Sequence, residues 1–97
     1  MTKSRQNVLA HPGTILRAEY LDHLGIRPGQ IANTIRVSKG RIDNLLAERR
    51  PVNADMSIRL GRYFGKPSDF WINLQYAHDL SKAEAGTDYS KITPRAA

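Results

Sequence analysis

The sequence predicts an all-α fold, a single domain of five helices with short flexible termini. Three observations lead to this prediction. The chain has 97 residues, the length of one domain. Hydrophobic residues make up 40% and charged residues 25% of it, as in ordinary globular domains. Apolar residues recur at spacings of three and four along most of the chain, which is the period of an α-helix rather than of a strand.

The first two helices are predicted between residues 11 and 35. His11-Pro12-Gly13 is a turn-like opening, and Gly25 is placed to end the first helix. The apolar residues at helical spacing between them are Ile15, Leu16, Tyr20, Leu21 and Leu24. The second helix starts at Arg27-Pro28-Gly29-Gln30, because proline is tolerated in a first turn. Its expected buried residues are Ile31, Ala32 and Ile35.

A third helix is predicted after a turn at Arg36-Val37. Ser38 is a favourable N-cap, since its hydroxyl can accept from a free amide of the first turn. The apolar side of this helix consists of Ile42, Leu45 and Leu46. Arg49-Arg50-Pro51 ends the helix, because proline cannot continue it.

The last two helices follow from similar signals. Asn53 is the expected N-cap of the fourth helix, with Asp55 near its positive end, and Gly65 ends it. The buried stripe of the fourth helix is Met56, Leu60 and Phe64. Pro67-Ser68-Asp69 opens the fifth helix, which is expected to span about residues 67–81. The apolar face of the fifth helix is Phe70, Trp71, Leu74 and Ala77.

The chain is expected to divide into one domain and two tails. Residues 1–8 form a flexible N-terminal tail, and residues 9–81 form the domain. Within the domain, the pair of short helices lies at about 27–47 and a C-terminal dimerisation helix at about 67–81. Residues 82–97 have little apolar periodicity, so a weakly ordered tail is expected there.

Positive charge is concentrated in the middle of the chain. The sequence has 15 Lys and Arg against 9 Asp and Glu, a net charge of +6. Between Arg27 and Arg50 there are six basic and two acidic residues. Such a basic segment indicates a polyanionic partner, with a solvated basic surface as the open alternative.

The second and third helices are a candidate helix-turn-helix motif. Two short helices that cross steeply over a tight turn need apolar residues where they touch. Ala32 is small enough to let the next helix cross closely, and Val37 fills the turn. A plain helical hairpin without a ligand is the open alternative, which the local basic charge disfavours.

The outward face of the third helix is the candidate DNA-reading surface, since it lies opposite the apolar side. Arg41 is suited to guanine and Asn44 to adenine, through two hydrogen bonds each. The candidates for base contact are Lys39, Gly40, Arg41 and Asn44. The candidates for phosphate contact are Ser38, Gln30, Arg49 and Arg50. Asp43 is expected to accept from cytosine or to pair with Arg41 or Arg36. The alternative for each side chain is an exposed polar residue.

The fifth helix supplies a candidate dimer interface. Apolar surface that remains after one small core is filled suits a two-fold partner. The residues expected at this interface are Phe70, Ile72 and Tyr76. Trp71 and Leu74 are instead expected in the core.

The sequence argues against an enzyme. His11, His23 and His78 lack metal-ligand spacing, and there is no cysteine, nucleophile elbow or glycine-rich phosphate loop. We therefore expect no catalytic residue, no metal and no cofactor. No apolar run approaches a membrane span or a secretory signal, so no membrane partner is expected. The lack of cysteine fits a cytoplasmic protein.

At these residues the chain resembles the HigA family of addiction-module antitoxins, within the Cro/repressor-like (XRE) helix-turn-helix proteins. The resemblance runs from about His11 to Leu80. Its most specific part is RPVNADMSIRLGRYFGKPSDFWINLQ, which is similar to the family pattern RPVTADMALRLARYFGTSPEFWLNLQ. Two positions depart from the family: Arg36 stands where glycine is frequent, and Gly40 where many relatives carry a polar side chain.

The resemblance implies a small all-α protein that is commonly a homodimer. Such a protein would bind a palindromic operator in double-stranded DNA at its own promoter. It would also form a complex with a RelE/HigB-like toxin that cleaves messenger RNA, as the antitoxin of a type II module. Two alternatives stay open: a stand-alone XRE-type repressor without a toxin partner, and a protein-binding helical module without DNA contact.

Overall fold

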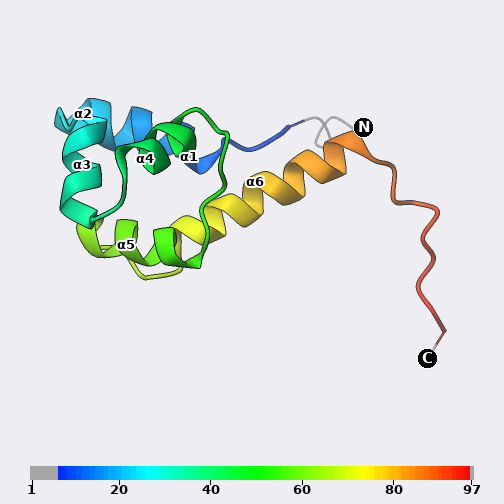
Figure 1. Ribbon diagram of the computed structural model, residues 1–97. Coiled ribbons are helices and arrows are strands. Elements are labelled where there is room, and N and C mark those ends of the chain that lie inside the picture. The colour runs from blue at the N-terminus through cyan, green and yellow to red at the C-terminus, as the bar shows by residue number, and fades with distance from the viewer. Residues whose placement is uncertain (1–6, 97) are drawn as a thin grey trace.

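A computed structural model describes residues 7–96 of the chain, and these residues form five helices and no strand. The first helix is continuous and consists of α1 (Pro12–Ile15), η2 (Leu16–Leu21) and α2 (Asp22–Leu24). It is followed by α3 (Pro28–Ile35), α4 (Lys39–Leu46), α5 (Ala54–Phe64) and α6 (Phe70–Gly86). The predicted all-α, five-helix class is confirmed. Figure 1 shows the shorter helices gathered at one end of α6, whose second half projects away from them.

The helix ends follow the local signals in the sequence. Gly25 and Gly65 end α2 and α5 in the left-handed conformation, with φ of 69° and 68°. Asn53 caps α5 by accepting from the Met56 amide at 2.9 Å. The middle of the first helix is π-helical, a feature that the periodicity did not predict.

One core joins the five helices. Each helix contributes at least one large apolar side chain that is fully buried, and each such burial stabilises the fold by roughly 1.5–3 kcal/mol for an aliphatic residue. These side chains include Leu16, Ile31, Ile42, Leu60 and Trp71. Tyr20, Phe64 and Phe70 surround Trp71, with ring centroids 5.0, 5.9 and 5.5 Å from its ring. Of the two residues that were expected in the core, Trp71 is buried, and Leu74 is half-buried and packs against the core.

The end of α6 corrects the expected C-terminal boundary. The helix runs to Gly86, whereas a weakly ordered tail was predicted from residue 82. Residues 82–86 are exposed, so they bury no apolar stripe that periodicity could reveal. Lys82, Ala83, Glu84 and Ala85 are strong helix formers, and propensity therefore extends α6 past the core. The following residues are exposed and not helical.

The N-terminal segment lies against α6. The Leu9 amide donates to Ser81 Oγ at 2.9 Å, and His78 Nδ1 lies 2.7 Å from the Leu9 carbonyl oxygen. Most of the expected N-terminal tail, residues 1–6, lies outside the described residues. Val8 is exposed, whereas Leu9 makes the two contacts with α6.

Candidate nucleic-acid interface

Helices α3 and α4 have the geometry expected of a helix-turn-helix motif. The predicted apolar residues of both helices are buried and pack together. Arg36 adopts the left-handed conformation (φ 63°, ψ 49°), and the Val37 amide donates to the Ala32 carbonyl at 3.0 Å. The left-handed conformation of a non-glycine residue costs about 1 kcal/mol. This cost explains why glycine suits the position, and the packing around it outweighs the cost.

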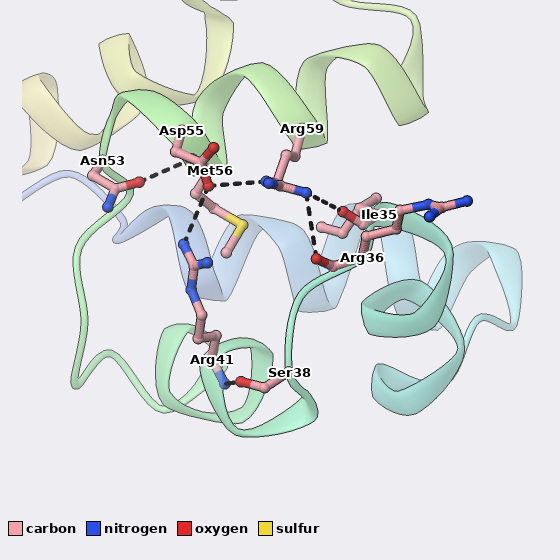
Figure 2. A network of polar contacts seen from close by, with 8 residues as sticks. All are labelled: Ile35, Arg36, Ser38, Arg41, Asn53, Asp55, Met56 and Arg59. Carbon is pink, nitrogen blue, oxygen red and sulfur yellow. Dashed lines mark hydrogen bonds and ion pairs between the residues drawn. The ribbon is translucent and has the colours of Figure 1, made fainter.

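Arg59 of α5 supports this turn. Its Nη1 donates to the carbonyl oxygen of Ile35 at 2.7 Å and, more weakly, to that of Arg36 at 3.4 Å. The last carbonyls of a helix have no partner within the helix, so a guanidinium there satisfies them. Figure 2 shows Arg59 reaching from α5 to the turn between α3 and α4. No local signal predicts this contact, because the two segments lie more than twenty residues apart in the chain.

The N-terminus of α4 is exposed and accessible. Ser38 is the predicted N-cap, and its Oγ accepts from the Arg41 amide at 3.2 Å. Lys39 and Gly40 form the exposed first turn, where the backbone amides lack partners within the helix. A Cβ at Gly40 would meet only Ser38 Oγ, at 3.9 Å. This end of α4 therefore leaves room for another molecule to approach the backbone closely.

Two of the candidate base-contacting side chains have partners within five residues of them in the chain. Lys39 Nζ lies 2.9 Å from Asp43 Oδ2, and both side chains are exposed. The expectation that Asp43 pairs with Arg41 or Arg36 is therefore wrong, because Lys39 stands one helical turn before it. Asn44 Oδ1 accepts weakly from Arg49 Nε at 3.4 Å.

Arg41 extends from α4 to the N-terminus of α5. Its Nη2 lies 3.5 Å from Asp55 Oδ2, and the same oxygen accepts from Arg59 Nε at 2.9 Å. The hydrogen bond from Arg59, its charge and the weaker contact of Arg41 hold the pKa of the Asp55 carboxyl below its usual value. Asp55 is consequently an anion between two guanidinium groups, as Figure 2 shows.

The candidate phosphate-contacting residues lie at two ends of the motif. Gln30 is in the first turn of α3, where its Oε1 accepts from the Arg27 amide at 3.2 Å and its amide nitrogen stays available as a donor. Arg49 and Arg50 are exposed just after α4. The structure thus places a donor group at the start of α3 and cationic groups after the end of α4. Donor and cationic groups at the two ends of such a motif suit contacts to phosphates.

The predicted dimer residues do not share one face of α6. Ile72 and Tyr76 are four residues apart on one side, and Tyr76 is 54% exposed. Ile72 and the exposed Ile58 of α5 both line one shallow depression of about 210 Å³. Phe70 instead packs edge-on against Trp71, with Lys66 Nζ 5.1 Å from its ring centroid.

Other kinds of site find no support among residues 7–96. These residues contain no group of three His, Cys, Asp or Glu side chains placed to hold a metal ion. Among the described helices, none combines the length and the apolar character that crossing a membrane requires.

Comparisons with known proteins agree with this geometry, although no family model matches the chain. A Pseudomonas aeruginosa protein solved with its 18-base-pair operator DNA aligns with a TM-score of 0.85 and 39% identity, over 90% of this chain and 97% of that one. The Pseudomonas aeruginosa antitoxin HigA, solved with the higBA promoter, aligns with a TM-score of 0.81 and 40% identity, over 88% and 96%. Virulence-associated protein I of Dichelobacter nodosus is 45% identical over 74 residues, which is 76% of this chain and 68% of that protein.

The fold and the exposed α4 define the class, a helix-turn-helix protein. The solved relatives narrow the class further, since they align over nearly their whole length. The chain belongs to the HigA family of antitoxins, and the resemblance described for its sequence is confirmed. Its relatives are antitoxins and helix-turn-helix transcriptional regulators rather than enzymes.

Proposed function

We propose that this protein is the antitoxin of a type II toxin–antitoxin module, and that it binds operator DNA as a homodimer and represses its own promoter. The observation that carries the proposal is the exposed start of α4, at Lys39 and Gly40, in a basic segment. Support comes from two relatives of the same fold that were solved with operator or promoter DNA. Promoter DNA and a messenger-RNA-cleaving toxin are both cytoplasmic partners, as expected from the sequence.

In this proposal α4 enters the major groove with its N-terminus first. Base contacts come from four positions in its exposed half, where Gly40 allows a close approach: Lys39, Gly40, Arg41 and Asn44. Phosphate contacts come from the flanking groups, and they fix the orientation of α4 without reading sequence: Ser38, Gln30, Arg49 and Arg50.

Footprinting of the DNA upstream of the coding region tests this mode of binding. A dimer with two α4 helices should protect two half-sites about 34 Å, or one helical turn, apart on one side of the duplex. Protection of a single half-site would contradict the dimer, and uniform protection along the fragment would contradict specific recognition.

The proposed dimer surface is the apolar side of α5 and α6. Three of its residues are large and exposed, namely Ile58, Tyr76 and Leu80, and the predicted Ile72 between them is half-buried against the core. Apolar side chains this exposed are typical of an interface. Phe70 is engaged with Trp71, so the proposal rests on Ile72 and Tyr76 rather than on all three predicted residues.

Tyr76→Glu tests the dimer surface, because it places a charge in the proposed apolar contact. Sedimentation at micromolar concentration should give a monomer mass with unchanged helical circular dichroism. Leu24→Glu is the matched control, since Leu24 of α2 is equally exposed (55% against 54%) outside this surface. A dimer that persists in Tyr76→Glu would exclude this interface.

The toxin part of the proposal rests on membership of the HigA family. We propose a RelE/HigB-like toxin, encoded next to this protein, as the second partner. Co-expression with the product of the adjacent reading frame should yield a complex that co-purifies, and the antitoxin should restore growth. Specific DNA binding without a toxin gene nearby would favour the stand-alone repressor instead.

A further inference from the structure

Asp55 is an acidic residue beside two arginines, Arg41 and Arg59. It lies in the first turn of α5, and its side chain is 54% exposed. Its Oδ2 is 3.5 Å from Arg41 Nη2 and 2.9 Å from Arg59 Nε (Figure 2). Arg41, the candidate for reading guanine, is therefore held against α5 in the unbound protein.

We propose that Asp55 is a specificity-determining residue, which retains Arg41 on random DNA and releases it to a correctly placed base edge. This inference rests on the proposed DNA-binding function. It assigns Asp55 a positioning role, because Asp55 acts on DNA recognition through Arg41.

Arg59 holds the Asp55 carboxylate in place, while Arg41 can leave this carboxylate for another partner. Arg59 donates to Asp55 at 2.9 Å and also to the Ile35 carbonyl at 2.7 Å, which ties the carboxylate to the turn before α4. The Arg41 contact is longer and its side chain is 32% exposed. Exposed ion pairs of this kind are weak, so Arg41 can leave while Asp55 stays on Arg59.

The competition between partners then favours bases over phosphates. On random DNA, Arg41 would exchange one anion, Asp55, for another, a phosphate, and the fixed carboxylate would repel that phosphate. Guanine is neutral and offers O6 and N7 to one guanidinium, so it adds two hydrogen bonds without this repulsion. Asp55 thus weakens non-specific binding more than operator binding.

Asp55→Asn tests the proposal, because it removes the charge and keeps the shape. The probes are a duplex carrying the DNA upstream of this gene and a scrambled duplex of equal composition. Binding to the scrambled duplex should tighten, and its slope of log K against log salt should steepen by about 0.9, the value for one added phosphate contact. The preference for the upstream duplex should fall about two- to fivefold, which matches an exposed ion pair.

Controls separate this role from a change in bulk charge or stability. Glu84→Gln removes one negative charge from the exposed end of α6 and should leave the preference unchanged. In an Arg41→Ala background, Asp55→Asn should not alter the preference for the upstream duplex, because the Arg41 side chain that Asp55 would retain is absent. If Asp55→Asn fails to fold, Asp55→Ser gives the same comparison, since serine also suits a first helical turn.

Three outcomes overturn the inference. In the first, wild-type protein prefers the upstream duplex, but Asp55→Asn changes neither this preference nor the salt slope. This result refutes the role of Asp55 and leaves the proposed function standing. The same shift in the Arg41→Ala background shows that Asp55 does not act through Arg41. Equal binding of both duplexes by wild-type protein refutes the proposed function, and this inference with it.

Discussion

Three of the four proposed base-contacting positions carry side chains that already have partners within the chain. Lys39 pairs with Asp43, Asn44 with Arg49, and Arg41 with Asp55, while Gly40 has no side chain. All three contacts are exposed or long, so each contributes little to folding stability. DNA binding in our proposal therefore exchanges weak internal contacts for contacts to bases and phosphates.

Arg41→Ala should weaken binding to the operator and relax its preference at one base pair. Loss of a guanidinium that reads guanine costs about 1–3 kcal/mol of binding free energy. Titration against duplexes with single base-pair substitutions measures this effect. An equal loss on operator and random DNA would reassign Arg41 to phosphate contact.

Arg49→Ala should affect all DNA sequences alike. Arg49 is exposed at the C-terminal side of α4, where it is placed for phosphate rather than for a base. The slope of log K against log salt should become shallower by about 0.9 on both operator and random duplexes. A slope that stays the same would remove Arg49 from the interface.

Local residue roles were predictable, and long-range ones were not. Ser38, Asn53 and Gly25 act within their own turns, so the sequence alone predicts their capping roles. Gln75 is buried and accepts from the Val52 amide at 2.8 Å, across 23 residues. Its position in an apolar stripe gives no signal for this contact, because the partner depends on how the helices pack.

At the level of elements, the first helix and α4 approach each other closely at Gly13. A Cβ there would lie 2.0 Å from the Leu45 carbonyl oxygen, which is backbone and cannot rotate away. Gly13→Ala should therefore force the two helices apart and destabilise the protein by about 1–3 kcal/mol or more. Thermal or denaturant unfolding measures this loss.

Gly86→Ala is the matched control for the variant at Gly13. No atom lies within 4 Å of a Cβ at Gly86, the last residue of α6. The same substitution should leave stability unchanged or raise it slightly there, since alanine is the better helix former. Equal effects of the two variants would contradict the close contact at Gly13.

The start of the first helix should make stability depend on pH. His11 Nδ1 accepts from the Gly13 amide at 2.9 Å and so caps α1 in its neutral form. Burial, and then the nearby His78, lower the pKa of His11 from its ordinary value of 6.5. The folded protein therefore binds fewer protons than the unfolded chain below pH 6.5. The stability from His11 is complete above that pH and falls as the pH drops towards the folded pKa.

Melting temperatures between about pH 5 and about pH 7.5 test this dependence. His11→Asn should flatten the profile, because an asparagine oxygen can cap the helix without titrating. An unchanged profile in His11→Asn would assign the pH dependence to other groups.

Element boundaries were predictable where a residue imposes them. Three helices end at left-handed residues, and their predicted limits agree with the structure. Helix α4 ends at Leu46, before the predicted Arg49-Arg50-Pro51, and Glu48 is the left-handed residue that follows it. The end of α6 was predicted wrongly, because an exposed segment of good helix formers has no apolar period. The π-helical turns of η2 left no signal either, since their hydrogen bonds depend on packing.

At the scale of the whole molecule, one core fixes the orientation of a basic motif. Each of the five helices contributes a fully buried residue, and Arg59 links α5 to the turn of the motif. The fold class was predictable because every helix carries its own apolar stripe. The three residues predicted for a dimer interface do not share one side of α6, since Phe70 packs on Trp71 while Ile72 lines the depression with Ile58.

The central claim is that the outward face of α4 recognises a specific duplex. Titration of the protein with the DNA upstream of its gene and with a scrambled duplex, at several salt concentrations, tests it most directly. We expect binding to the upstream duplex to be at least about 10³-fold tighter, with affinity for both duplexes falling steeply as salt rises. Equal affinity for the two duplexes, or affinity that does not depend on salt, would contradict the account.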